Sequence, residues 1–316
     1  MKAVFLLNPK AGKGKGFDKI KNTVLEVSKE TGLNAGIYIT KSIGDAEAFS
    51  RLAAKEAERT GEKTRLIACG GDGTLNEVLN GIMGFESVSL GVIPMGTGND
   101  FVRNFSNKDR FKDVKGQLLG ESQKCDIIKY SGLIEGKEKS GYCINMFNIG
   151  FDCNVVDLTA NLKTYPLLKG SLAYVAAVAG ILVKKKGANL RIEADGINVH
   201  EGPLLLTAIA NGSFCGGGFK GVPRASIYDG LMDINVIYDI TRREFIKKLP
   251  YYAKGTHMKL NNLGDFMYYS RCRKVVVTPL EGSMKLCIDG EITKAGKISM
   301  EIMPKAVDFI VPQFTR

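Results

Sequence analysis

The sequence predicts an α/β domain followed by a domain made mainly of β-strands. The chain has 316 residues, and a domain usually holds about 150, so two domains are expected. Residues 1–125 alternate short apolar runs with segments of helical spacing, which is typical of a parallel sheet covered by helices. From residue 126 onward strand-like runs dominate, and one helical stretch at 166–185 interrupts them.

The first half contains repeated strand–helix units. In chain order the expected elements are a strand at 3–8, a helix at 17–30, a strand at 35–40, a helix at 45–60, a strand at 65–69, a helix from about 74, and a strand at 89–94. Each strand is a short apolar run, and Gly-rich turns follow the third and fourth strands. Because ligands bind at the carboxyl ends of strands in such sheets, these turns are the first candidates for a binding site.

The second half is expected to form an antiparallel sandwich with helical insertions. Its expected strands are 125–130, 142–148, 189–194, 204–210, 232–238, 274–278 and 284–289. Asp195-Gly196 is the composition of a two-residue hairpin turn and predicts a hairpin between two of these strands.

Composition excludes several classes of protein. The hydrophobic fraction is 44% and the charged fraction 24%, as in ordinary globular proteins. No apolar run reaches the roughly 18 residues that a membrane span needs, and the first residues do not have the layout of a signal peptide. The seven cysteines include no C-x-x-C pair, which argues against zinc and disulfide frameworks. A cytoplasmic protein is expected.

The net charge is +11, and the basic excess is spread over both halves of the chain. Two clusters stand out, Lys10–Lys13–Lys15 and Lys184–Lys185–Lys186. For the second cluster, solvated surface and contact with anionic lipid headgroups both remain open. No nucleic-acid partner is expected, since no recognition motif accompanies the charge.

The segment Gly70-Gly71-Asp72-Gly73 follows the third expected strand. Glycines let the backbone approach a ligand and turn its N–H groups toward an anion, and the following helix start favours phosphate. Asp72 would repel phosphate unless a cation lay between them, so Mg²⁺ is inferred. A capping box of Thr74 and Glu77 is the simpler alternative for that part of the segment.

Four other segments are candidates. Residues 94–101 form a second Gly-rich turn, in which Asn99 or Asp100 could instead be a plain N-cap. Residues 8–16 alternate Gly and Lys after the first strand, but lack the P-loop pattern. Asp289-Gly290-Glu291 and Asp229-Gly230 carry acidic groups, and an Asp-Gly pair is also an ordinary hairpin turn.

Together these motifs resemble the lipid kinase family that contains diacylglycerol and sphingosine kinases, most closely the soluble bacterial diacylglycerol kinases. The ordered set is N-P-x-A-G from Asn8, T-x-x-x-G-D-A from Thr40, G-G-D-G-T-L-N-E, P-M-G-T-G-N-D-F, N-x-G-F-D (148–152), A-N-G-S with a Gly run (210–218), D-G-L-M-D and D-G-E. The resemblance spans nearly the whole chain. It implies a phosphofructokinase-like α/β nucleotide-binding domain at 1–125, a C-terminal β-sandwich domain for the lipid substrate at 126–300, and a segment at 301–316 that returns to the first domain.

The resemblance also implies roles for individual residues. The implied nucleotide contacts are Asn8, Pro9, Lys10, Ala11, Gly12, Thr40, Gly71, Asp72, Gly73, Thr74, Leu75, Asn76, Glu77 and Thr97. Asp72 is implied beside the phosphates and catalytic Mg²⁺, and Glu291, with Asp289 beside it, as the proton acceptor. Asp229 with the carbonyls of Ser226 and Leu231 matches a structural Mg²⁺ site, and Asp100 and Asp126 match acidic positions of the adjoining polar network. Lys10-Ala11 replaces the family's usual hydroxyl residues, which leaves the contacts of that loop undecided.

The implied activity is ATP-dependent phosphorylation of a lipid hydroxyl, with diacylglycerol as the first choice of acceptor. The alternatives are an NAD kinase, which shares the G-G-D-G-T turn, a kinase of a sphingoid base, ceramide, phosphatidylglycerol or a polyprenol, and a non-catalytic nucleotide-binding regulator. The substrate implies transient membrane association, for which the apolar stretch 167–183 with Lys184–Lys186 is a candidate. A homodimer remains open.

Overall fold

The computed structural model describes residues 2–14, 16–151, 153 and 187–312. The chain divides into two compact units. The first contains Met1–Ile127, Ile227–Asp229 and Met303–Arg316, and the second contains Ile128–Ser226 and Gly230–Ile302. The expected helix at 166–185, Asp152, Lys15 and the cluster at Lys184–Lys186 lie outside the described residues.

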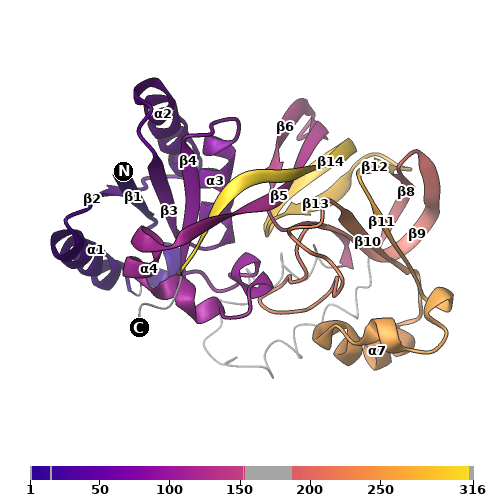
Figure 1. Cartoon of the computed structure of the whole chain (residues 1–316). Coiled ribbons are helices and arrows are strands. Elements are labelled where there is room, and N and C mark those ends of the chain that lie inside the picture. The colour runs from indigo at the N-terminus through magenta and orange to yellow at the C-terminus, as the bar shows by residue number, and fades with distance from the viewer. Residues whose placement is uncertain (1, 15, 152, 154–186, 313–316) are drawn as a thin grey trace. The chain divides into compact units, whose positions relative to one another are not determined.

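The first unit is built on a parallel sheet (Figure 1). Its strands are β1 (Lys2–Leu7), β2 (Asn34–Ile39), β3 (Thr64–Gly70), β4 (Val88–Pro94) and the last residues of β14 (Glu291–Val311). Their order is β14-β4-β3-β1-β2, and Phe309 of β14 lies opposite Leu90 of β4. Leu7 is in register with both Ile39 and Cys69, so the carboxyl ends of β1, β2 and β3 form one edge.

Helices connect these strands, and the spacing of the apolar residues predicts the first three of the four α-helices. They are α1 (Phe17–Thr31), α2 (Asp45–Thr60), α3 (Asp72–Ile82) and α4 (Val114–Leu119), with short 3-10 helices at Ala11–Gly14, Phe101–Asn104 and Lys108–Lys112. Gly32 and Gly61 end α1 and α2 in the left-handed conformation that glycine tolerates best. The buried face of α2 consists of small residues, among them Ala54 and Ala57, so α2 packs closely on α3.

The second unit is an antiparallel arrangement of strands. These are the second part of β5 (Glu121–Ile134), whose residues up to Ile127 belong to the first unit, β6 (Lys137–Cys143), β7 (Met146–Gly150), β8 (Ala188–Ala194), β9 (Ile197–Ala210), β10 (Met232–Tyr238), β11 (Met267–Cys272), β12 (Lys274–Pro279), β13 (Met284–Ile288) and the first part of β14. Their main order is β11-β10-β9-β7-β13-β14, and β8 and β12 link β9 to β14. One helix, α7 (Arg242–Lys254), and 3-10 turns at His257–Lys259 and Leu263–Asp265 join β10 to β11.

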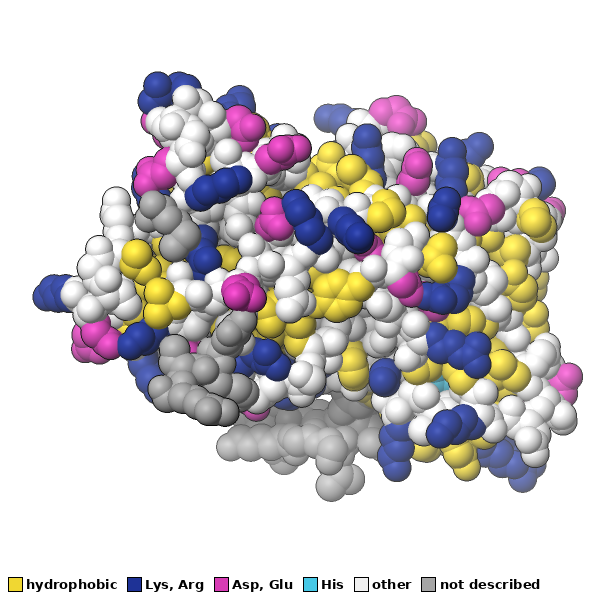
Figure 2. Space-filling view, in the orientation of Figure 1, with side chains coloured by type: hydrophobic (Ala, Val, Ile, Leu, Met, Phe, Trp, Pro, Cys, Tyr) yellow, Lys and Arg dark blue, Asp and Glu magenta, His cyan; other side chains and the backbone are white. Residues whose placement is uncertain are grey.

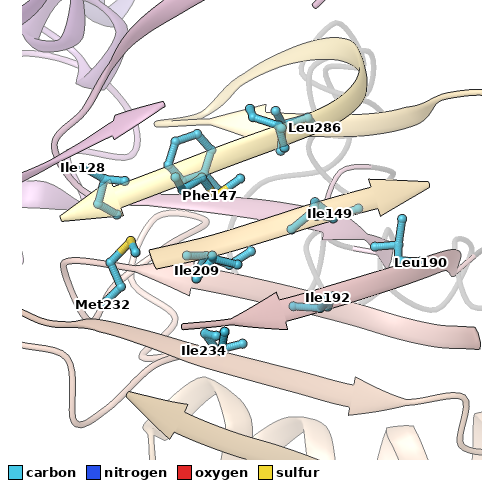
Figure 3. Close-up of a cluster of buried hydrophobic side chains, with 14 of the residues drawn as sticks. Ile128, Phe147, Ile149, Leu190, Ile192, Ile209, Met232, Ile234 and Leu286 are labelled. Atoms are coloured by element: carbon cyan, nitrogen blue, oxygen red, sulfur yellow. The ribbon is translucent and has the colours of Figure 1, made fainter. Parts of the chain in front are cut away.

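The core of the second unit follows from the two-residue period of its strands. In β10, the side chains of Met232 and Ile234 belong to a buried apolar cluster. Asp233 and Asn235 alternate with them, so their side chains lie on the opposite face of the sheet. Figure 3 shows this cluster, to which β7 contributes Phe147. Met232, Ile234 and Phe147 are fully buried, so a shift of one residue in β7 or β10 would expose an apolar face, and the cluster therefore fixes the register of the sheet.

The structure corrects several expected elements. The run 142–148 is two strands, because the backbone N–H groups of Ile144 and Asn145 turn away from the ladder to donate to Asp289. Helix α3 begins at Asp72 rather than about Thr74, and the segment after Asp100 forms a 3-10 turn at Phe101–Asn104. The apolar patterns of the sequence did not predict the strands β6, β11 and β14 or the helix α7, because these elements contain more polar residues than the predicted ones.

The hairpin predicted at Asp195-Gly196 is confirmed. It joins β8 and β9, and both of its residues have positive φ, as a type I′ turn requires. No helix within the described ranges is long and apolar enough to cross a membrane.

We expect Phe309→Ala to destabilise the protein by about 3–5 kcal/mol, because a buried aromatic leaves a cavity when it is truncated. Phe309 is fully buried and its ring lies 4.9 Å from that of Phe101. The measurement is urea unfolding. Leu52→Ala on the exposed side of α2 is the control and should change stability by less than about 0.5 kcal/mol. Equal effects of the two variants would contradict the anchoring of β14 in the first unit.

Candidate active site

The first unit has a topological switch point between β1 and β3. β2 lies on one side of β1, and the chain then returns to place β3 and β4 on the other side. In an open parallel sheet the two loops that leave such neighbouring strands run apart and open a crevice at their carboxyl ends. The loops that begin at Asn8 and Gly70 therefore border the position where this fold binds ligands.

Asn8 links the two loops across the switch point. Its side-chain Nδ2 donates to Oγ1 of Thr74 at 3.0 Å, and its Oδ1 accepts from the backbone N–H of Lys10 at 3.0 Å. The first bond joins the loop after β1 to the first turn of α3. The second bond folds the loop after β1 back on itself. The side chain of Asn8 therefore fixes both the shape of this loop and its position against α3.

The capping box expected for Thr74 and Glu77 is wrong. Thr74 lies inside α3 and its hydroxyl is the acceptor for Asn8. Oε2 of Glu77 accepts from the backbone N–H of Ala46 at 3.2 Å, at the beginning of α2. Both residues therefore connect different segments at the sheet edge, and neither caps its own helix.

The glycines after β3 and β4 allow two backbones to touch. A Cβ at Gly96 would lie 2.5 Å from Cα of Gly71 and 2.9 Å from Oδ1 of Asn99. A Cβ at Gly12, which also has φ of 57°, would lie 2.5 Å from the carbonyl oxygen of Met95. Any side chain at these positions would push the loops apart, since contacts below 3.0 Å require a shift of one partner.

Asp72 is the first residue of α3 and lies at the centre of these loops. Its Oδ1 accepts from the backbone N–H of Asp100 at 2.9 Å. A Cβ at Gly98 would lie 2.8 Å from its Oδ2, so glycine is required for the loop after β4 to approach the carboxylate. The structure thus brings the two Gly-rich turns together at one carboxylate.

Asn99 shapes the loop after β4. It adopts a left-handed conformation with φ of 51°, and its amide both accepts from the N–H and donates to the carbonyl of Gly96, at 3.0 and 2.7 Å. Asp100 precedes the 3-10 turn without a side-chain capping bond, and pairs with Arg103 at 3.3 Å. Asp100 thus occupies the N-cap position of the turn but does not cap it with its side chain, and Asn99 is not an N-cap. Thr97 lies exposed on the same loop.

The loop after β2 completes the edge. The N–H of Thr40 donates to the carbonyl of Leu7 at 3.0 Å, which holds it beside β1. Asp45 accepts from the N–H of Lys41 and from the hydroxyl of Tyr38, at 2.7 and 2.8 Å. These two bonds, the backbone one foremost, hold the pKa of Asp45 below its usual range.

The second unit places the D-G-E segment in a type I′ turn between β13 and β14, with φ of 46° at Asp289 and 94° at Gly290. Asp289 is only 5% exposed. Its carboxylate accepts from three consecutive backbone N–H groups, those of Ile144, Asn145 and Met146, at 2.8 to 3.1 Å. This carboxylate positions the turn, and the exposed Glu291 follows it.

Cys143 adds a fourth donor to Asp289. Its Sγ lies 3.1 Å from Oδ1 of the carboxylate. Burial, and then the neighbouring negative charge, raises the pKa of the Cys143 thiol well above its usual value, so the sulfur keeps the proton that it donates.

Two buried residues of this network were not singled out by the sequence. Asn145 Nδ2 donates to the carbonyl of Phe214 at 2.7 Å, and Asn211 Nδ2 to that of Ile144 at 2.7 Å. Asn211 belongs to the A-N-G-S motif, but nothing in its spacing indicated a bond to the strand break at Ile144.

The remaining acidic candidates divide between the units. Asp126 is fully buried in the first unit, where its carboxylate accepts from the N–H of Lys305 at 2.7 Å and its N–H donates to Ile227. Ser226, Asp229 and Leu231 lie where the chain passes between the units. Among the described residues no group of three His, Cys, Asp or Glu side chains is arranged to hold a metal ion.

The donors at the sheet edge fit a magnesium nucleotide. Carboxylate oxygens such as those of Asp72 are ligands that Mg²⁺ prefers. The glycine backbones beside Asp72 leave space that side chains would fill, and α3 begins there, so its first N–H groups favour an anion. A parallel sheet with glycine-rich turns at the carboxyl ends of its strands is the arrangement in which α/β domains bind phosphate-containing ligands.

Comparison with known proteins identifies the class. Residues 2–130 match the diacylglycerol kinase catalytic domain, and residues 145–311 match the YegS C-terminal NAD kinase beta sandwich-like domain. A diacylglycerol kinase of Bacillus subtilis is 31% identical over 92% of this chain and 89% of its own length. The chain belongs to the diacylglycerol kinase family, a family of lipid kinases, and is therefore a kinase whose phosphoryl donor is ATP.

Solved structures show the same fold. A diacylglycerol kinase from Bacillus anthracis superposes with a TM-score of 0.69 at 20% identity, covering 98% of this chain and 96% of that one. Yeast NADH kinase in complex with NADH superposes with a TM-score of 0.51 at 12% identity, over all of this chain and 84% of that one. The two-domain plan, with a β-sandwich-like second domain, is thereby confirmed.

We expect Gly96→Ala to weaken ATP binding by about tenfold or more, because the new methyl group separates the loops at Gly71 by a steric cost of about 1–3 kcal/mol. Isothermal titration with ATP measures the effect. Gly36→Ala in β2 is the matched control, since a Cβ there has its nearest neighbour at 3.9 Å. Unchanged affinity in Gly96→Ala would show that the contact of the two loops does not shape the nucleotide site.

We expect Asp289→Asn to cost about 2–4 kcal/mol of stability, because an amide cannot accept from all the N–H groups that face the carboxylate. Asp195→Asn is the matched control in the other Asp-Gly hairpin, where the carboxylate accepts from Arg273 and Lys274 but is exposed. Its expected cost is below about 1 kcal/mol. Denaturant unfolding compares the two, and similar costs would argue against the positioning role of Asp289.

Proposed function

We propose that this kinase transfers the γ-phosphate of ATP to the hydroxyl of diacylglycerol and forms phosphatidic acid. The observation that carries the proposal is Asp72, which lies where the glycine-rich turns after β3 and β4 meet, beside the switch point of the parallel sheet, in a chain of the diacylglycerol kinase family. Relatives that match nearly the whole chain are named diacylglycerol kinases.

The residues have separate roles in this proposal. Asn8 to Gly12, Thr40, Gly71 to Glu77 and Thr97 hold the nucleotide. Asn8, Thr74 and Glu77 do so partly by fixing the loops, as their hydrogen bonds indicate. Asp72 would hold Mg²⁺, which when bound neutralises phosphate charge. Residues 1–125 would form a phosphofructokinase-like ATP-binding domain, 126–300 the lipid-substrate domain, and 301–316 a segment belonging to the first domain.

Glu291 is proposed as the group that takes the proton of the acceptor hydroxyl as the P–O bond forms. It is exposed and follows directly on a turn that is held rigid by Asp289. Proton transfer of this kind is typically worth roughly 10²–10⁴-fold in rate. Asp289 has its carboxylate oxygens occupied by backbone donors, which favours Glu291 over Asp289 as the base.

A structural Mg²⁺ is proposed at Asp229 with the carbonyls of Ser226 and Leu231. These are hard oxygen ligands within a six-residue segment. Unfolding measured with Mg²⁺ and then with a chelator tests this site, since loss of a structural ion lowers the unfolding midpoint.

The acceptor is tested with purified protein, labelled ATP and a panel of alcohols in mixed micelles. The panel contains diacylglycerol, ceramide, a sphingoid base, phosphatidylglycerol, a polyprenol and NAD. Labelled phosphatidic acid as the main product supports the proposal. Preferred labelling of NAD or of another lipid would replace the proposed acceptor, and binding of ATP without any product would support a regulator.

We expect Asp72→Asn and Glu291→Gln each to lower turnover by about 10²-fold or more while the unfolding midpoint stays near that of the wild type. Glu301→Gln is the matched control, an exposed glutamate on the same strand as Glu291. Wild-type turnover in either site variant, with the control unchanged, would remove that residue from the chemistry.

A further inference from the structure

Helix α7 in the second unit presents a basic face to solvent. Arg243, Lys247 and Lys254 are spaced by four and eleven residues from the first, which places them along one side of the helix. All three are exposed. They lie opposite the side formed by Phe245 and Tyr252, which are buried against the unit.

Apolar side chains flank this basic stripe. Ile246 is 54% exposed and Tyr251 is 46% exposed, and the helical spacing puts one on each side of the stripe. Figure 2 shows dark blue Lys and Arg side chains interspersed with yellow hydrophobic ones at the position of α7. A helix that carries both kinds of group on its outward side differs from an ordinary surface helix, whose apolar residues face the core.

The helix is held in this form by the protein itself. Thr241 and Glu244 form a capping box at its beginning, and Gly255 ends it in the left-handed conformation. The ammonium group of Lys248 lies 3.9 Å above the ring of Phe266. A partner that binds α7 therefore meets a formed helix and does not have to order it.

The charge of the outward face is not neutralised within the helix. Glu244 is the single acidic residue of α7, and its carboxylate accepts from the N–H and hydroxyl of Thr241 at 3.0 and 2.8 Å. These bonds hold the pKa of Glu244 below its usual range, so it stays ionised at the N-terminal end of the helix. Glu244 lies one turn before Lys247, and the charges of Lys247 and Lys248 also contribute to lowering its pKa. No acidic residue follows Glu244 in α7, so the helix has five basic residues and a single carboxylate.

We propose that α7 binds the surface of bilayers that contain anionic phospholipids. The basic stripe complements the phosphate headgroups, and Ile246 and Tyr251 enter the interface between headgroups and acyl chains, as in interfacial amphipathic helices. Tyrosine is among the residues that favour this interface. The proposal goes beyond the phosphoryl transfer, because it assigns a docking surface outside the residues that hold nucleotide or chemistry.

Tryptophan fluorescence tests the insertion directly, because the chain contains no Trp. Ile246→Trp introduces a single fluorophore on α7. Leu52→Trp is the matched control on the exposed side of α2, where Leu52 is 67% exposed. With vesicles of phosphatidylcholine and phosphatidylglycerol in equal parts, the emission of Ile246→Trp should shift to shorter wavelength and that of Leu52→Trp should not. Neither should shift with phosphatidylcholine alone.

Charge reversal tests the electrostatic part. The triple variant Arg243→Glu, Lys247→Glu, Lys254→Glu should lower affinity for the anionic vesicles by about 10²-fold or more in co-sedimentation. The variant Lys19→Glu, Lys21→Glu, Lys29→Glu changes three exposed lysines of α1 and the net charge by the same amount. It should bind nearly as the wild type does.

Three results would overturn the proposal. They are equal losses in the two triple variants, the same emission from Ile246→Trp with and without anionic vesicles, and a dimer that Ile246→Ser dissociates, which would assign the face to a second copy of the chain. Vesicle binding is measured without ATP, so it does not depend on the proposed reaction. The α7 variant should phosphorylate a water-soluble short-chain diacylglycerol at the wild-type rate, which separates docking from catalysis.

Discussion

The contact between the backbones of Gly71 and Gly96 is the constraint on which the nucleotide edge depends. These glycines follow β3 and β4, and there is no room for a side chain between them. Their approach brings the loop after β4 near enough for the N–H of Asp100 to reach Asp72 at 2.9 Å. The glycine pattern of the sequence is therefore a requirement of packing at this edge of the sheet.

The Asp-Gly pairs show how burial separates similar sequence motifs. Asp195 and Asp289 have nearly the same φ, 47° and 46°, and each occupies a type I′ turn. Asp195 is exposed and accepts from a neighbouring strand end, whereas Asp289 is buried and interrupts the run 142–148 by drawing three N–H groups to itself. Asp72 differs from both, because it begins a helix. One dipeptide thus serves as a turn, as an internal anchor and as a candidate ligand-binding group.

Much of the first unit was predictable from local sequence, and the second much less. The period of the apolar residues gave β1 to β4 and α1 to α3 within two residues, because each buries one continuous face. In β14, by contrast, the stretch from Glu291 to Lys294 has a single apolar residue, and it forms a strand by pairing with β13 across the Asp289-Gly290 turn. Later residues of the same strand pair with segments that are more distant in sequence, such as Phe309 with Leu90 of β4. The bond of Glu77 to Ala46 and that of Asn8 to Thr74 likewise depend on tertiary proximity, which spacing alone does not contain.

The effect of the positive charge on the surface depends on where the basic residues lie and on which acidic residues are near them. A net charge of +11 says little by itself, because the excess is spread along the chain. On α2, Arg59 is paired with Glu56 at 2.6 Å, and Arg51 lies near Glu47, so the bases of that helix face acids one turn away. On α7 the only acidic residue, Glu244, takes part in the capping box. The basic residues of the outward face lie beside the exposed side chains of Ile246 and Tyr251. The two helices thus present different surfaces, and α7 has the combination of basic and apolar groups that an anionic interface can bind.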